Sequence, residues 1–265
     1  MKAIILCHPQ STDKLTNKMF NDSVEPIRIS CGTTKVEGVD FYESNDFFPT
    51  YAPWNSCLFE TSVILTVWEH ADQLIGDDNV AIMHTDIESH FGPDDTWANI
   101  EDGVKGAAVG LTAPVRFKGA WEDWLVPENA LCTPEHDPFL RHAFDNKIHV
   151  WDYIKKYDRD IFDFAMDTQP RLIYSHQFAC SREMFDALGL RLYNIASKLR
   201  LRDIGFWTPH MFERLIALYL AQHDSVVLTT AFWHHASSGI AGPGEQSLYG
   251  PRPLLFYKIM PRANS

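Results

Sequence analysis

The feature that most constrains the fold of this chain is a set of short apolar runs that stop abruptly at polar residues. Residues 80–83 are followed at once by His84-Thr85-Asp86-Ile87-Glu88, residues 3–7 by His8-Pro9, and residues 26–31 by Gly32. Apolar runs without alternation are typical of buried strands, as in α/β sheets. Open α/β sheets usually bind ligands at the carboxyl ends of their strands, so the polar residues after these runs are candidates for a functional site.

Other elements are predicted from periodicity and from residues that start or stop helices. The clearest helix begins at Thr208-Pro209, where a capping hydroxyl precedes proline. Its apolar positions recur on one face, at Phe212, Leu215, Ile216, Tyr219 and Leu220. Further helices are expected at 58–74, capped by Asn55, at 150–164 and at 181–199, and strands at 171–174 and 225–230. Residues 91–150 lack sustained periodicity and are predicted to form loops, short strands and a small insertion.

Length and composition favour one globular domain. The chain has 265 residues, of which 45% are hydrophobic, enough for a core of its own. The longest apolar run, residues 63–68, is far shorter than the roughly 20 residues that cross a bilayer, and residues 2–7 precede no small-residue cleavage site. Five cysteines, an odd number without a Cys-x-x-Cys pair, argue against a disulfide framework and a thiolate zinc site. We therefore expect a cytoplasmic protein with reduced cysteines.

Negative charge is concentrated in the first part of the chain. Residues 1–103 contain 18 Asp and Glu against 5 Lys and Arg, whereas residues 104–265 contain 17 against 18. The formal net charge of −12 disfavours nonspecific binding of nucleic acid. A local basic face can still contact phosphate, because charges act within a Debye length of about 10 Å. The candidate residues are Arg191, Lys198, Arg200 and Arg202, and the alternative is a solvated charged surface.

Asp86 and Glu88 form the candidate metal site. In an extended segment they project to the same side, together with His84, and carboxylates are the ligands that a hard cation prefers. Such a cation could neutralise a diphosphate. The alternative is an acidic solvated loop, because this spacing alone is weakly specific.

Two further candidates lie towards the C-terminus. His234-His235 follows a β-branched strand and could supply a metal ligand; otherwise one ring packs on Trp233 and the other is solvated. Glu213 lies in the first turns of a predicted helix, where the helix dipole favours an acid, and it is a candidate general base. The alternative for Glu213 is a salt bridge with Arg214 or another cation.

Several common motifs are absent: Gly-x-Gly-x-x-Gly, Gly-x-x-x-x-Gly-Lys-Ser/Thr, Gly-x-Ser-x-Gly and His-Glu-x-x-His. Their absence disfavours dinucleotide oxidoreductases, P-loop enzymes, serine hydrolases with the usual nucleophile elbow and the common zinc peptidases.

Five features are more specific in combination than any one of them alone. They are the N-terminal strand, the helix rich in Glu and Trp at 59–69, His84-Thr85-Asp86-Ile87-Glu88, residues 177–186 and residues 205–215. Together they resemble a nucleotide-sugar glycosyltransferase of the GT-A type. More narrowly, the sequence is similar to an uncharacterised glycosyltransferase-like family associated with bacterial polysaccharide synthesis, whose Glu-Arg-Leu helix matches Glu213-Arg214-Leu215. The resemblance extends loosely over residues 60–230.

The resemblance implies a fold and a separate role for each of two parts of the chain. The expected fold is α/β, a GT-A-like Rossmann-type three-layer sandwich with a mixed central sheet and a helical C-terminal part. It would form a single catalytic domain over residues 1–265, in which residues 1–103 bind the nucleotide-sugar and residues 104–265 face the acceptor.

The resemblance also implies roles for residues. Asp86 and Glu88 take the place of the family's Asp-x-Asp element and bind Mn²⁺ or Mg²⁺ and the donor diphosphate. The remaining roles fall to four side chains: His234 or His235 completes the metal shell, and Arg200 and Arg202 assist the leaving group. Glu213 is the base candidate on the acceptor side, although a retaining transferase needs none. The Glu at the third position departs from the family pattern, and no nucleobase motif identifies the donor.

Other functions remain open from the sequence. The acceptor is a glycan by resemblance, but a hydroxymethylated base in bacteriophage DNA is physically allowed if the basic residues contact phosphate. A metal-dependent hydrolase would use a binuclear centre built from His84, Asp86, Glu88, His90, His234 and His235. An inactive carbohydrate-binding module would use the aromatic residues, 13% of the chain. In a transferase, the Gly-rich residues 239–250 are candidates for a lid over the donor.

Overall fold

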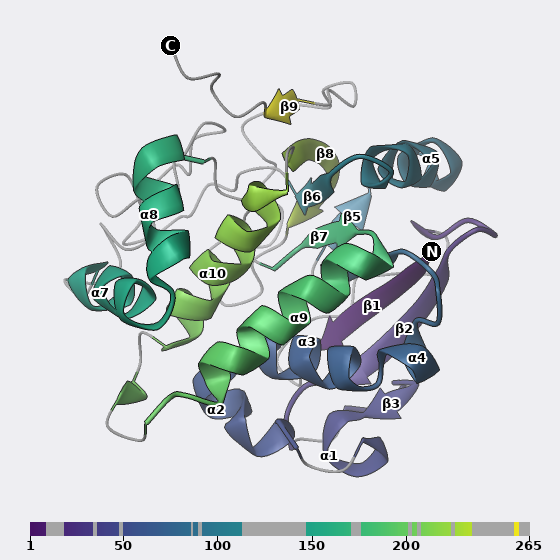
Figure 1. The fold of residues 1–265 in the computed structure, drawn as a ribbon. Helices are drawn as coiled ribbons and strands as arrows, with labels where there is room; N and C mark the ends of the chain where they lie inside the picture. Colours follow the sequence, from purple (N-terminus) through teal and green to yellow (C-terminus); the bar gives the residue numbers. More distant parts are fainter. Residues whose placement is uncertain are drawn as a thin grey trace, which may run out of the picture.

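A sheet with helices on both faces organises the chain. The computed structural model describes residues 1–8, 19–33, 36–47, 50–85, 87–89, 92–112, 147–170, 176–200, 203–205, 208–223, 226–234 and 257–259. The elements, shown in Figure 1, are β1 (Lys2–Cys7), β2 (Glu25–Ser30), β3 (Phe41–Tyr42), α1 (Glu43–Asp46), the 3₁₀ helix η2 (Ala52–Trp54), α2 (Asn55–Leu58), α3 (Glu60–Glu69), α4 (Ala71–Leu74), β4 (Val80–His84), β5 (Ile87–Ser89), α5 (Pro93–Val104), β6 (Ala108–Thr112), α7 (Lys147–Tyr157), α8 (Arg159–Thr168), β7 (Phe178–Cys180), α9 (Arg182–Ala196), α10 (Thr208–Gln222), β8 (Val226–His234) and β9 (Tyr257–Ile259).

The described strands form one mixed sheet. Their order is β3-β2-β1-β4-β7-β6-β8-β5, and β9 pairs with β8. β1 is parallel to β2 and to β4, so that Cys7 lies opposite Ser30 and Leu6 opposite His84. β7 is antiparallel to β4 and β6, and β5 and β9 are antiparallel to β8. The strands β1, β2 and β4 therefore end at one edge of the sheet, which we call the carboxyl edge.

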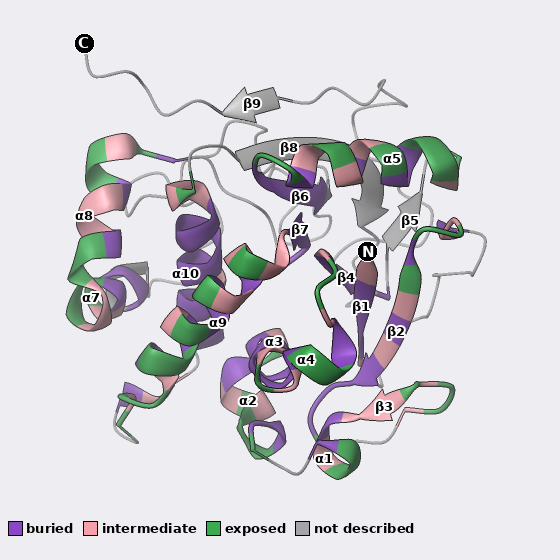
Figure 2. Ribbon diagram, turned by 45° about the vertical axis from the view of Figure 1, so that its right-hand side comes forward, coloured by how far each residue is buried: buried purple, intermediate pink, exposed green. Residues whose placement is uncertain are grey.

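Alternate residues of the central strands face two separate cores. Ile4 and Leu6 of β1 pack in the larger core with α3, α9 and α10, whereas Ile5 packs in a smaller core with Trp97 and Ile100 of α5. This alternation arises because successive strand residues point to opposite faces of a sheet. Figure 2 shows the central strands buried between these layers. The expected three-layer α/β fold with a mixed central sheet is confirmed.

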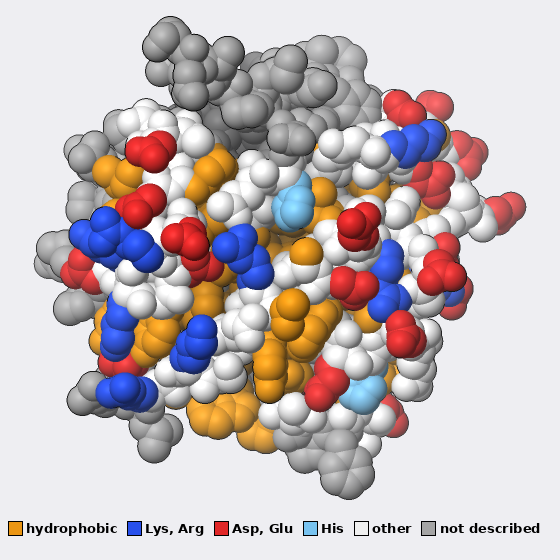
Figure 3. All heavy atoms as spheres, in the orientation of Figure 1, with side chains coloured by type: hydrophobic (Ala, Val, Ile, Leu, Met, Phe, Trp, Pro, Cys, Tyr) orange, Lys and Arg blue, Asp and Glu red, His pale blue; other side chains and the backbone are white. Residues whose placement is uncertain are grey.

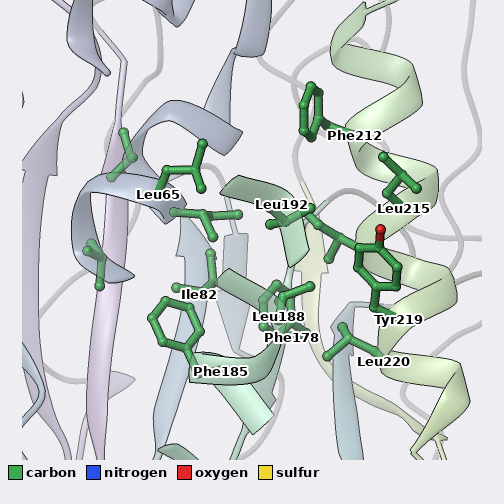
Figure 4. Packing of buried hydrophobic residues seen from close by; sticks show 14 of the residues in the cluster. Leu65, Ile82, Phe178, Phe185, Leu188, Leu192, Phe212, Leu215, Tyr219 and Leu220 are labelled. Atoms are coloured by element: carbon green, nitrogen blue, oxygen red, sulfur yellow. The ribbon is translucent and has the colours of Figure 1, made fainter. Parts of the chain in front are cut away.

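The helix α10 is buried on most of its surface. Figure 4 shows Leu215, Tyr219 and Leu220 of α10 close to Leu188 and Leu192 of α9. The helices α2, α3, α7, α8 and α9 all pack against α10. The predicted start at residue 208 is confirmed, but the prediction of a single buried face is wrong because neighbouring helices surround α10.

The predicted strands at 3–7, 26–31, 80–83 and 225–230 are confirmed within a few residues, as is the helix at 181–199. The single helix predicted at 58–74 is wrong, because the chain forms α2, α3 and α4 instead. Phe59, with φ of 47°, breaks the helix between α2 and α3. Asn55 does not cap that helix; it lies inside α2, and its amide group donates to Phe59 O and Ser62 Oγ, each at 2.9 Å.

Two helical predictions in the middle of the chain also need correction. Residues 91–150 include the helix α5, which the sequence analysis missed; its buried Trp97, Ile100 and Val104 are spaced at i, i+3 and i+7. The helix predicted at 150–164 is divided into α7 and α8 by Asp158, whose carboxylate accepts from Ile161 N at 3.1 Å. The strand predicted at 171–174 lies outside the described residues. No described helix is long and apolar enough to cross a membrane.

Candidate functional site

Polar side chains from four elements meet at the carboxyl edge. His8 directly follows β1, His84 ends β4, and Glu60 begins α3. His176 lies two residues before β7, and because β7 is antiparallel to β4, the start of β7 is at the edge where β4 ends. His8 and His84 continue the alternation of Leu6 and Ile82, which face α3. These four residues therefore form one group, which we call the Glu60 cluster.

Glu60 is the centre of this cluster. Its Oε1 lies 3.4 Å from His8 Nε2, and its Oε2 lies 3.9 Å from His176 Nδ1. The other nitrogen of His176, Nε2, lies 3.4 Å from Thr61 Oγ1. His176 is 6% exposed and has a φ of 52°, a left-handed conformation that is uncommon for any residue with a side chain. The surroundings of Glu60 thus fix the position of two imidazole rings.

The pKa of Glu60 is far below its ordinary value. Burial alone would raise this pKa, but the nearby ring of His8 and the charges of His84 and His176 lower it by more. Glu60 is therefore an anion at neutral pH. The imidazole rings around this carboxylate carry ring N–H groups, so the cluster can present N–H donors to an anionic ligand.

Glu213 and His210, both in the first turns of α10, lie beside this cluster. Glu213 Oε2 lies 2.5 Å from Arg214 Nη1 and 3.9 Å from His210 Nδ1. Burial raises the pKa of Glu213, but Arg214 and the nearby His210 and His176 lower it to about 2. The salt bridge with Arg214, the alternative given for Glu213 in the sequence analysis, is present.

Glu43 lies fully buried behind the cluster. Its carboxylate accepts from Gly32 N at 2.5 Å and from Thr66 Oγ1 at 3.0 Å. Burial is the largest influence and raises the pKa of Glu43, whereas these hydrogen bonds and the charge of His8 lower it by less. Burial raises the pKa of the Cys31 thiol, and the negative charges of Glu60 and Glu43 raise it further. Glu43 thus connects the turn after β2 with the helix α3 through hydrogen bonds, and it does not face a ligand.

The predicted metal-site segment lies next to the end of β8. The short strand β5 pairs antiparallel with β8, so that Ile87 is opposite His234 and Glu88 is opposite Trp233. Of the predicted line of His84, Asp86 and Glu88, His84 ends β4 and Glu88 belongs to β5, so these two are on different strands. The backbone nevertheless brings the Asp-x-Glu segment and the first histidine of the pair to neighbouring positions.

Most of the other predicted site residues lie outside the described part of the chain, whereas Arg200 and Arg191 lie within it. Asp86, His90, Arg202, His235 and residues 239–250 lie outside the described residues, as do the side chains of Glu88 and His234. Arg200 is exposed at the end of α9. Arg191 packs over the Tyr219 ring at 4.5 Å and donates to Gln222 Oε1 at 2.5 Å. Among the described residues, no group of three His, Cys, Asp or Glu side chains has the geometry to hold a metal.

Sequence reasoning missed most of the Glu60 cluster. Glu60, His8, His176 and His210 are single residues far apart in the chain, so no spacing connects them. The usable signal was that His8 follows an apolar strand, as His84 does. Two buried hydroxyls at the carboxyl edge, Ser30 Oγ and Thr85 Oγ1, were also missed; neither has a hydrogen-bond partner among the described residues.

Comparison with known proteins supports the fold. No protein-family model matches the sequence, and no curated protein matches it. Among solved structures, the chain matches the apo structure of WbbM, a bifunctional glycosyltransferase, with a TM-score of 0.52 and 13% identity. The fold resembles that of a glycosyltransferase. The match covers 88% of this chain and 45% of the WbbM chain, so this chain spans less than half of that protein's length. At this identity, the likeness concerns the fold alone.

Proposed function

We propose that the protein is a GT-A-type glycosyltransferase that transfers a sugar from a nucleotide-sugar to an acceptor hydroxyl. Asp86 and Glu88, with His234 or His235, would hold Mn²⁺ or Mg²⁺. The observation that carries the proposal is the pairing of β5 with β8, which places the Glu88 backbone next to that of Trp233-His234 at the end of β8. Two carboxylates and an imidazole are a suitable ligand set for Mn²⁺. The glycosyltransferase-like fold supports the same reading.

The residues of the chain would act on the donor from several sides. The metal, when bound, would neutralise the diphosphate leaving group as the bond to the sugar breaks. His8, His84 and His176, around ionised Glu60, would donate hydrogen bonds to donor oxygens. Ser30 and Thr85, buried without partners among the described residues, would gain partners from the donor. Arg200 and Arg202, which follow α9 in the chain, would approach the phosphates of the donor.

The two parts of the chain would take different substrates. Residues 1–103 would bind the nucleotide-sugar, because they supply β1, β2, β4 and the Glu60 cluster apart from His176. Residues 104–265 would face the acceptor, a glycan. We further propose that transfer takes place in the cytoplasm, because the described cysteines Cys7, Cys31, Cys57 and Cys180 are free thiols.

A thermal-shift screen tests the proposed function. Purified protein is mixed with UDP-, GDP-, CMP- and dTDP-sugars, each with and without Mn²⁺, since a ligand that binds only the folded state raises the unfolding temperature. We expect a shift with one nucleotide class that depends on the metal, and transfer or slow hydrolysis of that donor. Asp86→Ala should abolish the shift, whereas Asp94→Ala, an exposed carboxylate on α5, should retain it.

The metal-dependent hydrolase gives a different outcome in the same screen. It needs several histidines bound to metal at once, so transition metals alone should stabilise the protein strongly and no nucleotide-sugar should add to the shift. That result would contradict the transferase. A donor shift without any turnover would instead favour the binding module.

A further inference from the structure

Glu213 is poorly suited to accept a proton. Its Oε2 lies 2.5 Å from the guanidinium of Arg214, which is 1% exposed. The pKa of Glu213 is about 2, chiefly because Arg214 and the neighbouring histidines outweigh the effect of burial. An efficient general base has a pKa near the working pH. The carboxylate therefore stays ionised and acts on its neighbours.

His210 is the neighbour with the right chemistry. It is the third residue of α10, one turn before Glu213, and its Nδ1 lies 3.9 Å from Glu213 Oε2. The side chain of His210 is 14% exposed, so a substrate can reach part of the ring. A carboxylate beside one imidazole nitrogen holds the ring's tautomer and stabilises the protonated form.

The Glu60 cluster connects this pair to the carboxyl edge. The charge of His176 lowers the pKa of both Glu60 and Glu213, so His176 is close to both carboxylates. Imidazole and carboxylate groups thus alternate from the end of β4 to the first turns of α10, as His84, Glu60, His176, Glu213 and His210. His210 is at the end of this series away from β4, on the side expected to face the acceptor.

We propose that His210 is the general base of the transfer and that Glu213 is the residue that positions it. This inference rests on the proposed function. The acceptor oxygen forms a bond to the anomeric carbon, and the bond from that carbon to the diphosphate breaks. The diphosphate leaves with the electron pair, and the proton of the acceptor hydroxyl passes to the ring nitrogen of His210 that does not face Glu213. A single displacement of this kind inverts the anomeric configuration.

Charged groups of several elements surround His210. Glu213 and Arg214 lie beside it on α10, the positive end of the α10 dipole is at the same turns, and His176 is close to Glu213. Glu60 lies beyond His176 and adds a more distant negative charge. Replacing Glu213 by Gln removes the nearest negative charge, the one that would stabilise the imidazole once it has accepted the proton.

The test measures transfer and product stereochemistry with the donor found in the screen. In the wild-type protein, the product should have inverted configuration by proton NMR. His210→Gln should lower kcat by about 10²- to 10⁴-fold, the usual contribution of a general base. The thermal shift with donor and metal should be unchanged in this variant, which shows that it folds and binds the donor. His223→Gln, an exposed histidine after α10, should retain wild-type kcat.

The pH profile separates a base from a structural histidine. The acid limb of the kcat profile should be lost in His210→Gln and altered in Glu213→Gln, with a lower plateau in both variants. Retention of configuration by the wild-type protein, or an unchanged kcat in His210→Gln, would overturn the inference while leaving the transferase intact. If the wild-type protein transfers no sugar from any donor, the proposed function itself has failed. Should His210→Gln not fold, the stereochemistry of the wild-type product still tests the inference, because retention of configuration would overturn it.

Discussion

Three glutamates at the carboxyl edge differ in the direction of their pKa shifts because they have different partners. Glu43 accepts only neutral donors such as Gly32 N and Thr66 Oγ1, and burial raises its pKa. Glu60 and Glu213 are also largely buried, yet histidines and Arg214 lower their pKa values. At the scale of the residue, the neighbours and not the residue type decide whether the pKa of a buried carboxylate is raised or lowered.

Glu213 should make folding stability depend on pH in the acid range. Its pKa falls from an ordinary 4.5 to about 2 in the folded protein, so folding favours the ionised form. This contribution is complete above pH 4.5 and is lost as the pH falls from about 4.5 to about 2; each pKa unit corresponds to about 1.4 kcal/mol, hence about 3 kcal/mol in all. Urea unfolding of wild type and Glu213→Gln at pH 7, 5 and 3 measures it.

Glu213→Gln should also be less stable at pH 7, by about 3 to 5 kcal/mol, because buried Arg214 loses its carboxylate partner. The difference from wild type should shrink as the pH falls below about 4.5 and be smaller at pH 3, because Glu213 is then protonated in the unfolded chain but still largely ionised in the folded protein. Glu37→Gln, at an exposed position, serves as the control and should follow wild type. A constant difference at all three pH values would show that the Glu213 charge does not stabilise the fold.

At the scale of the element, the contact of α3 with α9 requires a glycine. A Cβ on Gly189 would lie 2.1 Å from Cγ of Trp68, closer than any real contact. Gly189→Ala should therefore destabilise the protein by about 1 to 3 kcal/mol, the usual result of overpacking, despite the better helix propensity of Ala. Gly106→Ala, where nothing lies within 4 Å of the added Cβ, is the matched control. Equal denaturation midpoints for the two variants would contradict the predicted steric conflict.

The connection from α9 to α10 depends on Asp203. Its carboxylate accepts hydrogen bonds from Tyr157 Oη at 2.5 Å, Lys156 Nζ at 2.8 Å and Tyr153 Oη at 3.4 Å, all on α7. Asp203→Ala should lower the free energy of unfolding by about 2 to 3 kcal/mol, because these are hydrogen bonds to a buried charge. Asp163→Ala, which breaks the exposed ion pair with Arg159, should cost less than about 1 kcal/mol. Similar losses in the two variants would contradict an anchoring role for Asp203.

The sequence predicted elements where local pattern and tertiary packing agree. Strands such as β1 and β4 are buried on both faces, so their apolar runs are visible in the sequence. The break at Phe59 was not predictable, because an exposed aromatic residue with positive φ carries no local signal. The helix α5 was missed because only one narrow face, with Trp97 and Ile100, is buried. For the site, adjacent residues such as Asp86 and Glu88 were visible, whereas the Glu60 cluster is assembled by the topology alone.

At the scale of the whole molecule, charge determines which acceptors can approach. On the face shown in Figure 3, Lys and Arg side chains lie over α7 and the end of α9, and Asp and Glu side chains are more frequent over α4 and α5. The helix α8 carries one Arg and three Asp. Some of the positive charge is already neutralised, since Arg191 lies 3.7 Å from Asp158 Oδ2. The basic region is therefore smaller than its sequence suggests, and it belongs to a chain with a net charge of −12.

For the proposed transferase, this charge distribution favours a glycan acceptor over DNA. Strong binding of a duplex needs several phosphate contacts, and affinity falls steeply with salt when such contacts carry it. We expect no measurable binding of a fluorescent duplex at about 0.15 M salt, near physiological ionic strength, by anisotropy. Binding that falls linearly with salt on logarithmic axes, and that weakens in Arg200→Ala but not in the control Arg159→Ala, would instead support a DNA acceptor. Exposed Arg200 follows α9 and Arg159 begins α8, so the pair distinguishes a local phosphate site from general positive charge.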